Sequence, residues 1–233
     1  MKIEIWSDIM CPFCYIGKRQ LETALEQFPD NEFEIEWKSF QLDPSITPQP
    51  DKDVYTYLAE RKGMTVEQSK EMHKGVAERA KSVGLDYNFD KAVISNSLNA
   101  HRIIQLAKTK NIGDRMEEIF FKAYFTDGQD LNNGQTLIKL GTQAGLEENE
   151  IREVLESDTL FLKEVESDIK EAGEIGVQGV PFFVFDRKYA VSGAQPVETF
   201  ENALQQTYKE TVSPFKDLSG QNGASCDADG CSI

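Results

Sequence analysis

The first forty residues alternate between extended and helical hydrophobic patterns. Residues 3–7 are extended and mostly apolar, and residues 12–28 repeat apolar side chains at roughly helical spacing. After a break at residues 29–31, apolar and charged side chains alternate over residues 33–38, which is typical of a half-buried strand. This order predicts a βαβ unit, whose two strands pair in parallel through a right-handed crossover.

The middle of the chain has a different pattern. A Pro-rich loop at residues 42–50 leads into a region, from about residue 53 to about residue 173, where almost every segment is an amphipathic helix. Thr65 and Gln68 have the spacing of a capping box, which marks one helix start. Further helices are expected at residues 97–108, 115–125, 137–144, 148–155 and 160–171. Without a convincing fixed-period repeat, this region is predicted to be a helical module and not a solenoid.

Strand character returns near the end of the chain. Residues 181–185 form a short buried-strand candidate, residues 186–188 can turn, and residues 189–191 can pair antiparallel with the first strand of this pair. A helix is expected to start at Pro196. From Ser213 onward the chain is rich in Gly, Ser, Asn and Asp, and this composition predicts a flexible tail.

Cys11-Pro12-Phe13-Cys14 lies where the first strand runs into the first helix. A strand followed by Cys-x-x-Cys at a helix N-terminus is typical of a redox dithiol in a thioredoxin-like fold. Cys11 at the helix mouth is the candidate nucleophile, because free N–H groups and the helix dipole stabilise a thiolate there. Cys14, one turn further, is expected to resolve the mixed disulfide. The alternatives are a zinc site, for which the remaining ligands come only from the tail cysteines or the two histidines, and two inert core cysteines.

The two ends of the chain complete each other. Neither flank makes a core alone, so their union predicts an α/β thioredoxin-like fold, β-α-β … β-β-α, with a large all-helical insertion. The expected division is residues 1–44 and 175–212 for the thioredoxin-like domain, 45–174 for the insertion, and 213–233 for a flexible tail with a Cys-x4-Cys pair.

These residues resemble the DsbA-like thioredoxin family, and within it the FrnE-type branch. The similarity covers about residues 2–208 and includes the Cys-x-x-Cys, the helical insertion and residues 176–184, Gly-Val-Gln-Gly-Val-Pro-Phe-Phe-Val. Further similar stretches are residues 6–8, 40–44, 96–102 and 192–195. The resemblance implies that Pro181 is cis beside the dithiol, and that Pro12, Phe13, Val180 and Pro181 bind substrate. The residues alone also allow Pro181 to be an ordinary trans proline at a strand start.

Phe13 is a departure from DsbA proper, which typically has a histidine between the cysteines. A histidine there can stabilise the thiolate by charge or by a hydrogen bond, and Phe13 can do neither. We therefore expect a redox potential more reducing than that of DsbA.

Composition excludes several partners. Asp and Glu outnumber Lys and Arg by 40 to 25, for a net charge of −15, which argues against nucleic acids and anionic membranes. The chain has no recognisable targeting segment and no apolar run near the roughly 20 residues of a membrane span, so a cytoplasmic location is expected. The sequence contains no nucleotide, flavin or pyridoxal motif. We expect no cofactor and no metal, with glutathione as a candidate co-substrate.

Cys226 and Cys231 form a second pair in the tail. Four intervening residues let the two sulfurs meet through a turn, so an auxiliary redox dithiol is one hypothesis; an incidental tail and a metal-binding clip are the others. His101 lies in the stretch that resembles the family and receives no role, and His73 is expected on a solvated helix surface. Trp6, Phe40 and Phe182 are candidates for a cleft wall, although core packing is their default.

Three functions are compatible with the sequence. The first is a thiol-disulfide oxidoreductase that acts on polypeptide or small-molecule disulfides and dithiols, as a monomer or homodimer. The second is a glutathione-dependent isomerase or transferase, of the 2-hydroxychromene-2-carboxylate isomerase or kappa-class type. The retained pair of cysteines counts against it, because these enzymes resemble the chain in scaffold but use a serine-type residue. The third is a non-enzymatic polypeptide-binding holdase.

Overall fold

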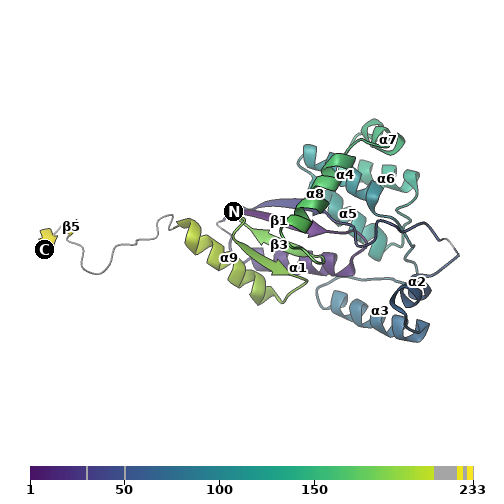
Figure 1. Cartoon of the computed structure of the whole chain (residues 1–233), viewed down its shortest axis with the longest axis horizontal. Helices are drawn as coiled ribbons and strands as arrows, with labels where there is room; N and C mark the ends of the chain where they lie inside the picture. Colours follow the sequence, from purple (N-terminus) through teal and green to yellow (C-terminus); the bar gives the residue numbers. More distant parts are fainter. Residues whose placement is uncertain (30, 50, 213–224, 228–229, 233) are drawn as a thin grey trace.

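A four-stranded sheet lies between helices in the computed structural model, which describes residues 1–29, 31–49, 51–212, 225–227 and 230–232 (Figure 1). Strand β1 (Lys2–Ser7) pairs in parallel with β2 (Glu34–Ser39), and α1 (Pro12–Leu25) connects them. On its other side β1 pairs antiparallel with β3 (Phe182–Phe185), which pairs antiparallel with β4 (Tyr189–Ser192). The parallel pairing predicted for the first two strands is confirmed.

Alternation along the strands gives the sheet two apolar faces. Ile3, Ile5 and Phe183 point to the face where α1 packs against α9 (Val197–Val212), whose Phe200 lies on Phe183. Trp6 points to the other face. Helix α8 (Leu162–Glu174) lies on that side, opposite α9 (Figure 1). Because both faces are covered, the end of β1 and the start of α1 are held by a packed core on each side.

The helical insertion lies between β2 and β3, as predicted. Its helices are α2 (Val54–Lys62), α3 (Val66–Lys81), α4 (Leu98–Thr109), α5 (Gly113–Phe125), α6 (Gly134–Ala144), α7 (Glu148–Glu156) and α8. The predicted capping box is confirmed, because the Thr65 hydroxyl accepts the Gln68 N–H and the Gln68 side chain accepts the Thr65 N–H. Helix α8 starts two residues later than expected, since Phe161 takes a left-handed backbone as its N-cap.

Aromatic packing joins the insertion to the sheet. Phe121 on α5 stacks on Tyr15 of α1 with ring centroids 5.0 Å apart, and its ring meets Trp37 of β2 edge-on. The aromatic residues of α5 are buried, as the helical spacing predicted. The two flanks and the insertion therefore share one continuous core.

The C-terminal residues that the structure describes form two short strands. β5 (Ser225–Asp227) and β6 (Gly230–Ser232) pair antiparallel, and the register sets Cys226 opposite Cys231. The sequence predicts no strands in this stretch, so the pair is an addition to the prediction. Residues 213–224 of the expected tail lie outside the described residues. Across the described ranges, no helix is long and apolar enough to cross a membrane.

Candidate functional site

The Cys-x-x-Cys motif sits where β1 ends and α1 begins. Cys11 is the N-cap of α1 with an extended backbone, its N–H donates to the Asp8 carbonyl at 2.9 Å, and Pro12 takes the first helical position. Cys14 follows within the first turn, where its N–H donates to the Cys11 carbonyl at 3.0 Å. Both cysteines are free thiols, and Cys11 is 3% exposed while Cys14 is fully buried. Cys11 therefore stands nearer the surface, in front of Cys14.

Val180 and Pro181 face this motif from the loop before β3. The Val180–Pro181 peptide bond is cis, and the Cys11 thiol lies 3.4 Å from the Val180 carbonyl oxygen, to which it donates. Pro12, Phe13 and Val180 line one cleft with Cys11. Pro181 lies behind them, buried where α1 passes β3. The fold thus brings together residues that are about 170 positions apart in the chain.

A cleft of about 460 Å³ opens over Cys11. Its walls are mostly apolar and come from the β1–α1 loop, the segment after β2, helices α2 and α3, and the chain before α4. The apolar lining residues are Met10, Phe13, Leu42, Ile46, Val54, Leu58, Met72, Val76, Phe89, Ala92, Ile94, Phe125 and Val180. The charged lining residues include Arg61, which pairs with Asp43, and Lys62. Such a cleft suits an apolar group beside Cys11.

His73 is not on a solvated surface, contrary to the prediction. It is half-buried on α3 and lines the cleft, with Nδ1 2.8 Å from the Ser69 carbonyl and its ring edge-on to Tyr55 and Phe89. Burial lowers the pKa of His73, which favours the neutral ring. The sequence does carry a signal for this face, because Ser69, His73 and Val76 are spaced by four and three residues.

The two thiols differ in environment. Burial raises the pKa of Cys14 well above its usual value, and the hydrogen bond and charge of Cys11 raise it further. The Asp8 N–H and the Ser7 hydroxyl lower the pKa of Cys14 and so partly oppose these effects. Cys14 therefore keeps its proton, whereas Cys11 stands at the N-terminus of α1 and lines the cleft.

Tyr87 supports the motif from the insertion, and sequence reasoning missed it. Its hydroxyl donates to the Pro12 carbonyl at 2.7 Å, and its ring stacks on Tyr15 and Phe125. Burial raises the pKa of Tyr87, and its electrostatic interactions with Cys11 and Cys14 raise it further, so its phenol stays protonated and can donate. Nothing in the residues around Tyr87 points to the dithiol, because the contact is purely tertiary.

Trp6, Phe40 and Phe182 do not line the cleft. They belong to the core between the sheet and α8, where Trp6 Nε1–H donates to the Asp168 carbonyl at 2.9 Å and the Trp6 and Phe182 rings meet edge-on. Their default interpretation, core packing, is the correct one. His101 is fully buried on α4 and is not a cleft residue either.

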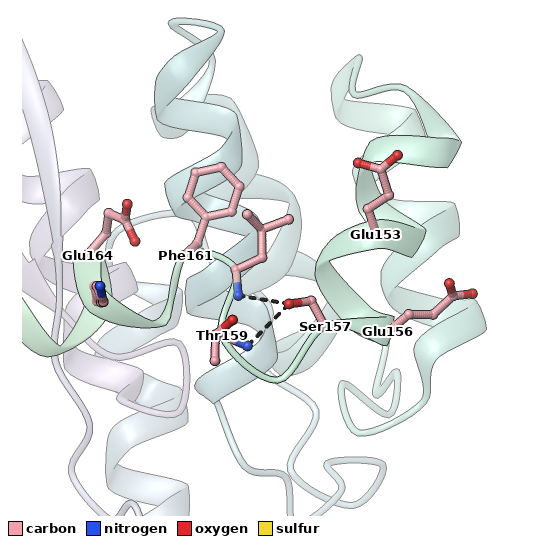
Figure 2. A pocket seen from close by; sticks show the side chains of 8 residues that line it. Glu153, Glu156, Ser157, Thr159, Phe161 and Glu164 are labelled. Carbon is pink, nitrogen blue, oxygen red and sulfur yellow. Dashed lines mark hydrogen bonds between the residues drawn. The ribbon is translucent and has the colours of Figure 1, made fainter.

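A second hollow, of about 610 Å³, lies at the turn between α7 and α8. Ser157 shapes this turn, because its hydroxyl oxygen accepts the Thr159 and Leu160 N–H groups (Figure 2). Figure 2 also shows Glu153, Glu156 and Glu164 at its edges. Among the residues that the structure describes, no cysteine and no histidine lines this hollow. Over the described ranges, no cluster of three or more His, Cys, Asp or Glu is arranged to hold a metal ion.

The sheet, the helix that starts at a dithiol and the inserted helices define a thioredoxin-fold protein. The sequence profile of the DSBA-like thioredoxin domain matches residues 2–205, and the chain belongs to this family. A crystal structure of a probable DsbA oxidoreductase from Streptomyces coelicolor is 36% identical, with a TM-score of 0.85 over 100% of this chain and 99% of that one. The uncharacterized protein YwbO of Bacillus subtilis (strain 168) is 27% identical over 89% of this chain and 98% of its own length.

More distant solved structures share the fold. The cytosolic disulfide reductase DsbM from Pseudomonas aeruginosa has a TM-score of 0.65 at 14% identity, over 90% of this chain and 99% of its own. A 2-hydroxychromene-2-carboxylate isomerase has a TM-score of 0.66 at 14% identity, over 93% of this chain and 100% of its own. The fold class expected from sequence is confirmed, and an enzyme of the general oxidoreductase or isomerase kind fits this family.

Proposed function

We propose that this protein is a thiol-disulfide oxidoreductase that uses Cys11 and Cys14 as its redox dithiol. The observation that carries the proposal is the placement of Cys11, at the mouth of α1, inside an apolar cleft and against the Val180 carbonyl, with a protonated Cys14 directly behind it. A nucleophile in front and a resolving thiol within one turn is the arrangement that disulfide exchange requires.

The exchange proceeds in two displacements. The Cys11 thiolate attacks one sulfur of a substrate disulfide, so a Cys11–substrate disulfide forms and the other substrate sulfur leaves as a thiolate. Cys14 then loses its proton and attacks the Cys11 sulfur, which forms the Cys11–Cys14 disulfide and releases the second substrate thiol. The substrate gains two electrons and the protein dithiol loses two; the reverse sequence oxidises a substrate dithiol.

Substrates are proposed to be polypeptide or small-molecule disulfides and dithiols. The apolar cleft walls support a substrate with an apolar group beside its sulfur, and the main chain at Val180 supports pairing with an extended segment. Glutathione is a candidate co-substrate, and a DsbM structure with GSH shares the fold. We further propose a cytoplasmic, FrnE-type enzyme, free of cofactors and metals, whose potential is more reducing than that of DsbA because Phe13 cannot stabilise a thiolate.

A redox titration tests this function. The full chain and a Cys11→Ser/Cys14→Ser variant are equilibrated in glutathione buffers, and the thiol state is read by mass after alkylation, with peptides assigned to each cysteine pair. We expect one two-electron transition in the peptide that carries Cys11 and Cys14, and none at those positions in the variant.

Two outcomes would overturn the proposal. If both thiols stay free across the whole range of buffers, the dithiol is not a redox centre. If the double variant keeps glutathione-dependent isomerisation or holdase activity at the level of the full chain, the cleft works without the cysteines. The midpoint itself decides whether the protein mainly oxidises or reduces its substrates.

A further inference from the structure

Asp8 is a buried carboxylate that the exchange reaction does not use. It is 1% exposed and lies just before the dithiol motif. Its Oδ1 accepts the Met10 N–H at 3.1 Å, and its Oδ2 accepts the Leu42 N–H at 2.7 Å. Its backbone carbonyl accepts the Cys11 N–H. One residue therefore ties the loop that carries Cys11 to a segment that lies 34 positions later in the chain.

Both residues that donate a backbone N–H to the Asp8 carboxylate line the cleft. Met10 and Leu42 line it from different segments, and Leu42 is 45% exposed. Leu42 lies in an irregular stretch after β2, so no strand or helix holds it. The hydrogen bond from its N–H to Asp8 is thus a direct link between this exposed apolar wall and the Cys11 loop.

His101 stands behind Asp8. Its side chain on α4 is fully buried, and Nε2 lies 3.5 Å from Asp8 Oδ1. Within the described residues neither ring nitrogen makes a hydrogen bond, so the Asp8 carboxylate is the polar group that this ring faces. A buried polar ring without hydrogen bonds is costly as plain core packing, which points to a role beside Asp8.

We propose that Asp8, held by His101, is a positioning residue that sets the width of the substrate cleft by tying Leu42 to the Cys11 loop. Its carboxylate acts through Met10 and Leu42, and only its backbone N–H reaches a reacting sulfur, that of Cys14. Its consequence for catalysis rests on the proposed function, but its effect on the cleft does not. Widening the cleft is expected to favour bulky groups at Cys11 over small ones.

The test measures access to Cys11 without relying on turnover. Reduced full-length protein is alkylated by iodoacetamide and, separately, by the bulkier N-phenylmaleimide, and mass mapping of the Cys11 peptide gives both rates. The variants are Asp8→Asn, His101→Phe, which keeps ring volume, and His101→Gln, which keeps an N–H donor. Asp168→Asn is the control, because Asp168 is also buried and accepts a backbone N–H, but from Ser39, which unlike Met10 and Leu42 does not line the cleft.

Asp8→Asn is expected to raise the ratio of N-phenylmaleimide to iodoacetamide rates about threefold to tenfold, the range that one lost hydrogen bond corresponds to. His101→Phe, which removes the polar contact with Asp8, is expected to raise the same ratio. Amide exchange of the peptide around Leu42 should accelerate in the same variants. His101→Gln and Asp168→Asn should stay near wild type in both measurements. If Asp8→Asn does not fold, the comparison of His101→Phe with His101→Gln tests the proposal.

An unchanged or lower ratio in Asp8→Asn and His101→Phe would overturn the inference, and so would an equal rise in Asp168→Asn. If the redox titration fails, these rates remain readable, so the two proposals fail separately. If the redox function holds, the same variants should raise KM for oxidised glutathione while kcat changes little, since Asp8 acts on cleft shape.

Discussion

Two adjacent glutamates have pKa values shifted in opposite directions. Glu117 and Glu118 are neighbours on α5, but Glu117 is fully buried, with Oε2 lacking a hydrogen-bond partner among the described residues. Burial raises the pKa of Glu117 well above its usual range, and the charge of Asp114 adds to this. Glu118 is partly buried, which also opposes its charge, but hydrogen bonds from Arg19 and Tyr15 prevail and lower its pKa.

These two shifts predict opposite results for Glu→Gln substitution. A glutamate whose pKa is raised in the folded state favours folding below its unfolded-state pKa of about 4.3, and this contribution to stability is lost as pH rises. Glu117→Gln should therefore be more stable than wild type at pH 8, by roughly 1–3 kcal/mol, but not at pH 4. A lowered pKa favours folding above the unfolded value, so Glu118→Gln should be less stable at pH 8. Urea unfolding at both pH values checks this; equal effects of the two variants would contradict it.

At the scale of elements, the approach of α1 to β3 positions the dithiol. Gly17 on α1 faces this contact, where an added Cβ would lie 3.0 Å from Phe183 Cζ and 3.1 Å from Pro181 Cγ. Phe183 and Pro181 are buried, so neither has room to move. A glycine is therefore needed here for packing, and the distance between α1 and the Val180 loop depends on it.

Gly17→Ala is expected to destabilise the protein and lower its disulfide exchange rate. Overpacking costs about 1–3 kcal/mol, whereas the gain in helix propensity is about 1 kcal/mol. Gly75→Ala in α3 is the matched control, because an added Cβ there meets nothing within 4 Å and should stabilise by about 0.5–1 kcal/mol. Thermal unfolding and disulfide exchange rates of both variants test this prediction. Equal stabilisation by the two substitutions would refute the packing argument.

At the scale of the whole molecule, the chain contains a second cysteine pair far along the sequence from the first. The β5–β6 register sets Cys226 opposite Cys231, and directly opposite residues lie about 4.5–5.5 Å apart at Cα, a separation that a disulfide spans. We propose that this pair exchanges electrons with Cys11 and Cys14 as an auxiliary dithiol.

A Cys226→Ser/Cys231→Ser variant should slow multiple turnover with a dithiol reductant several-fold. Single turnover of reduced protein with a disulfide should stay unchanged, because that step needs Cys11 and Cys14 alone. Stopped-flow and steady-state rates separate the two steps. The same multiple-turnover rate in variant and full chain would leave the second pair without a part in catalysis.

The sequence by itself determined the features that depend on neighbours along the chain. A βαβ start, the helices of the insertion, the Thr65 cap and the Cys11–Cys14 motif follow from periodicity, capping and local spacing, because these are set within a few residues. The order of these elements also predicted that the two flanks unite in one thioredoxin-like fold, and the family resemblance agreed with this. The local patterns and the family resemblance indicate the same fold, which is why the architecture could be predicted.

Only the tertiary structure decided how the cleft is built. Leu42 meets Asp8, His101 stands behind Asp8, and Tyr87 supports Pro12 across separations that no local pattern encodes. His73 was misplaced for the same reason, since an amphipathic pattern shows that α3 has two faces but not which element covers each. Burial and hydrogen-bond partners arise from packing between distant segments, and they shape the cleft and separate the two thiols.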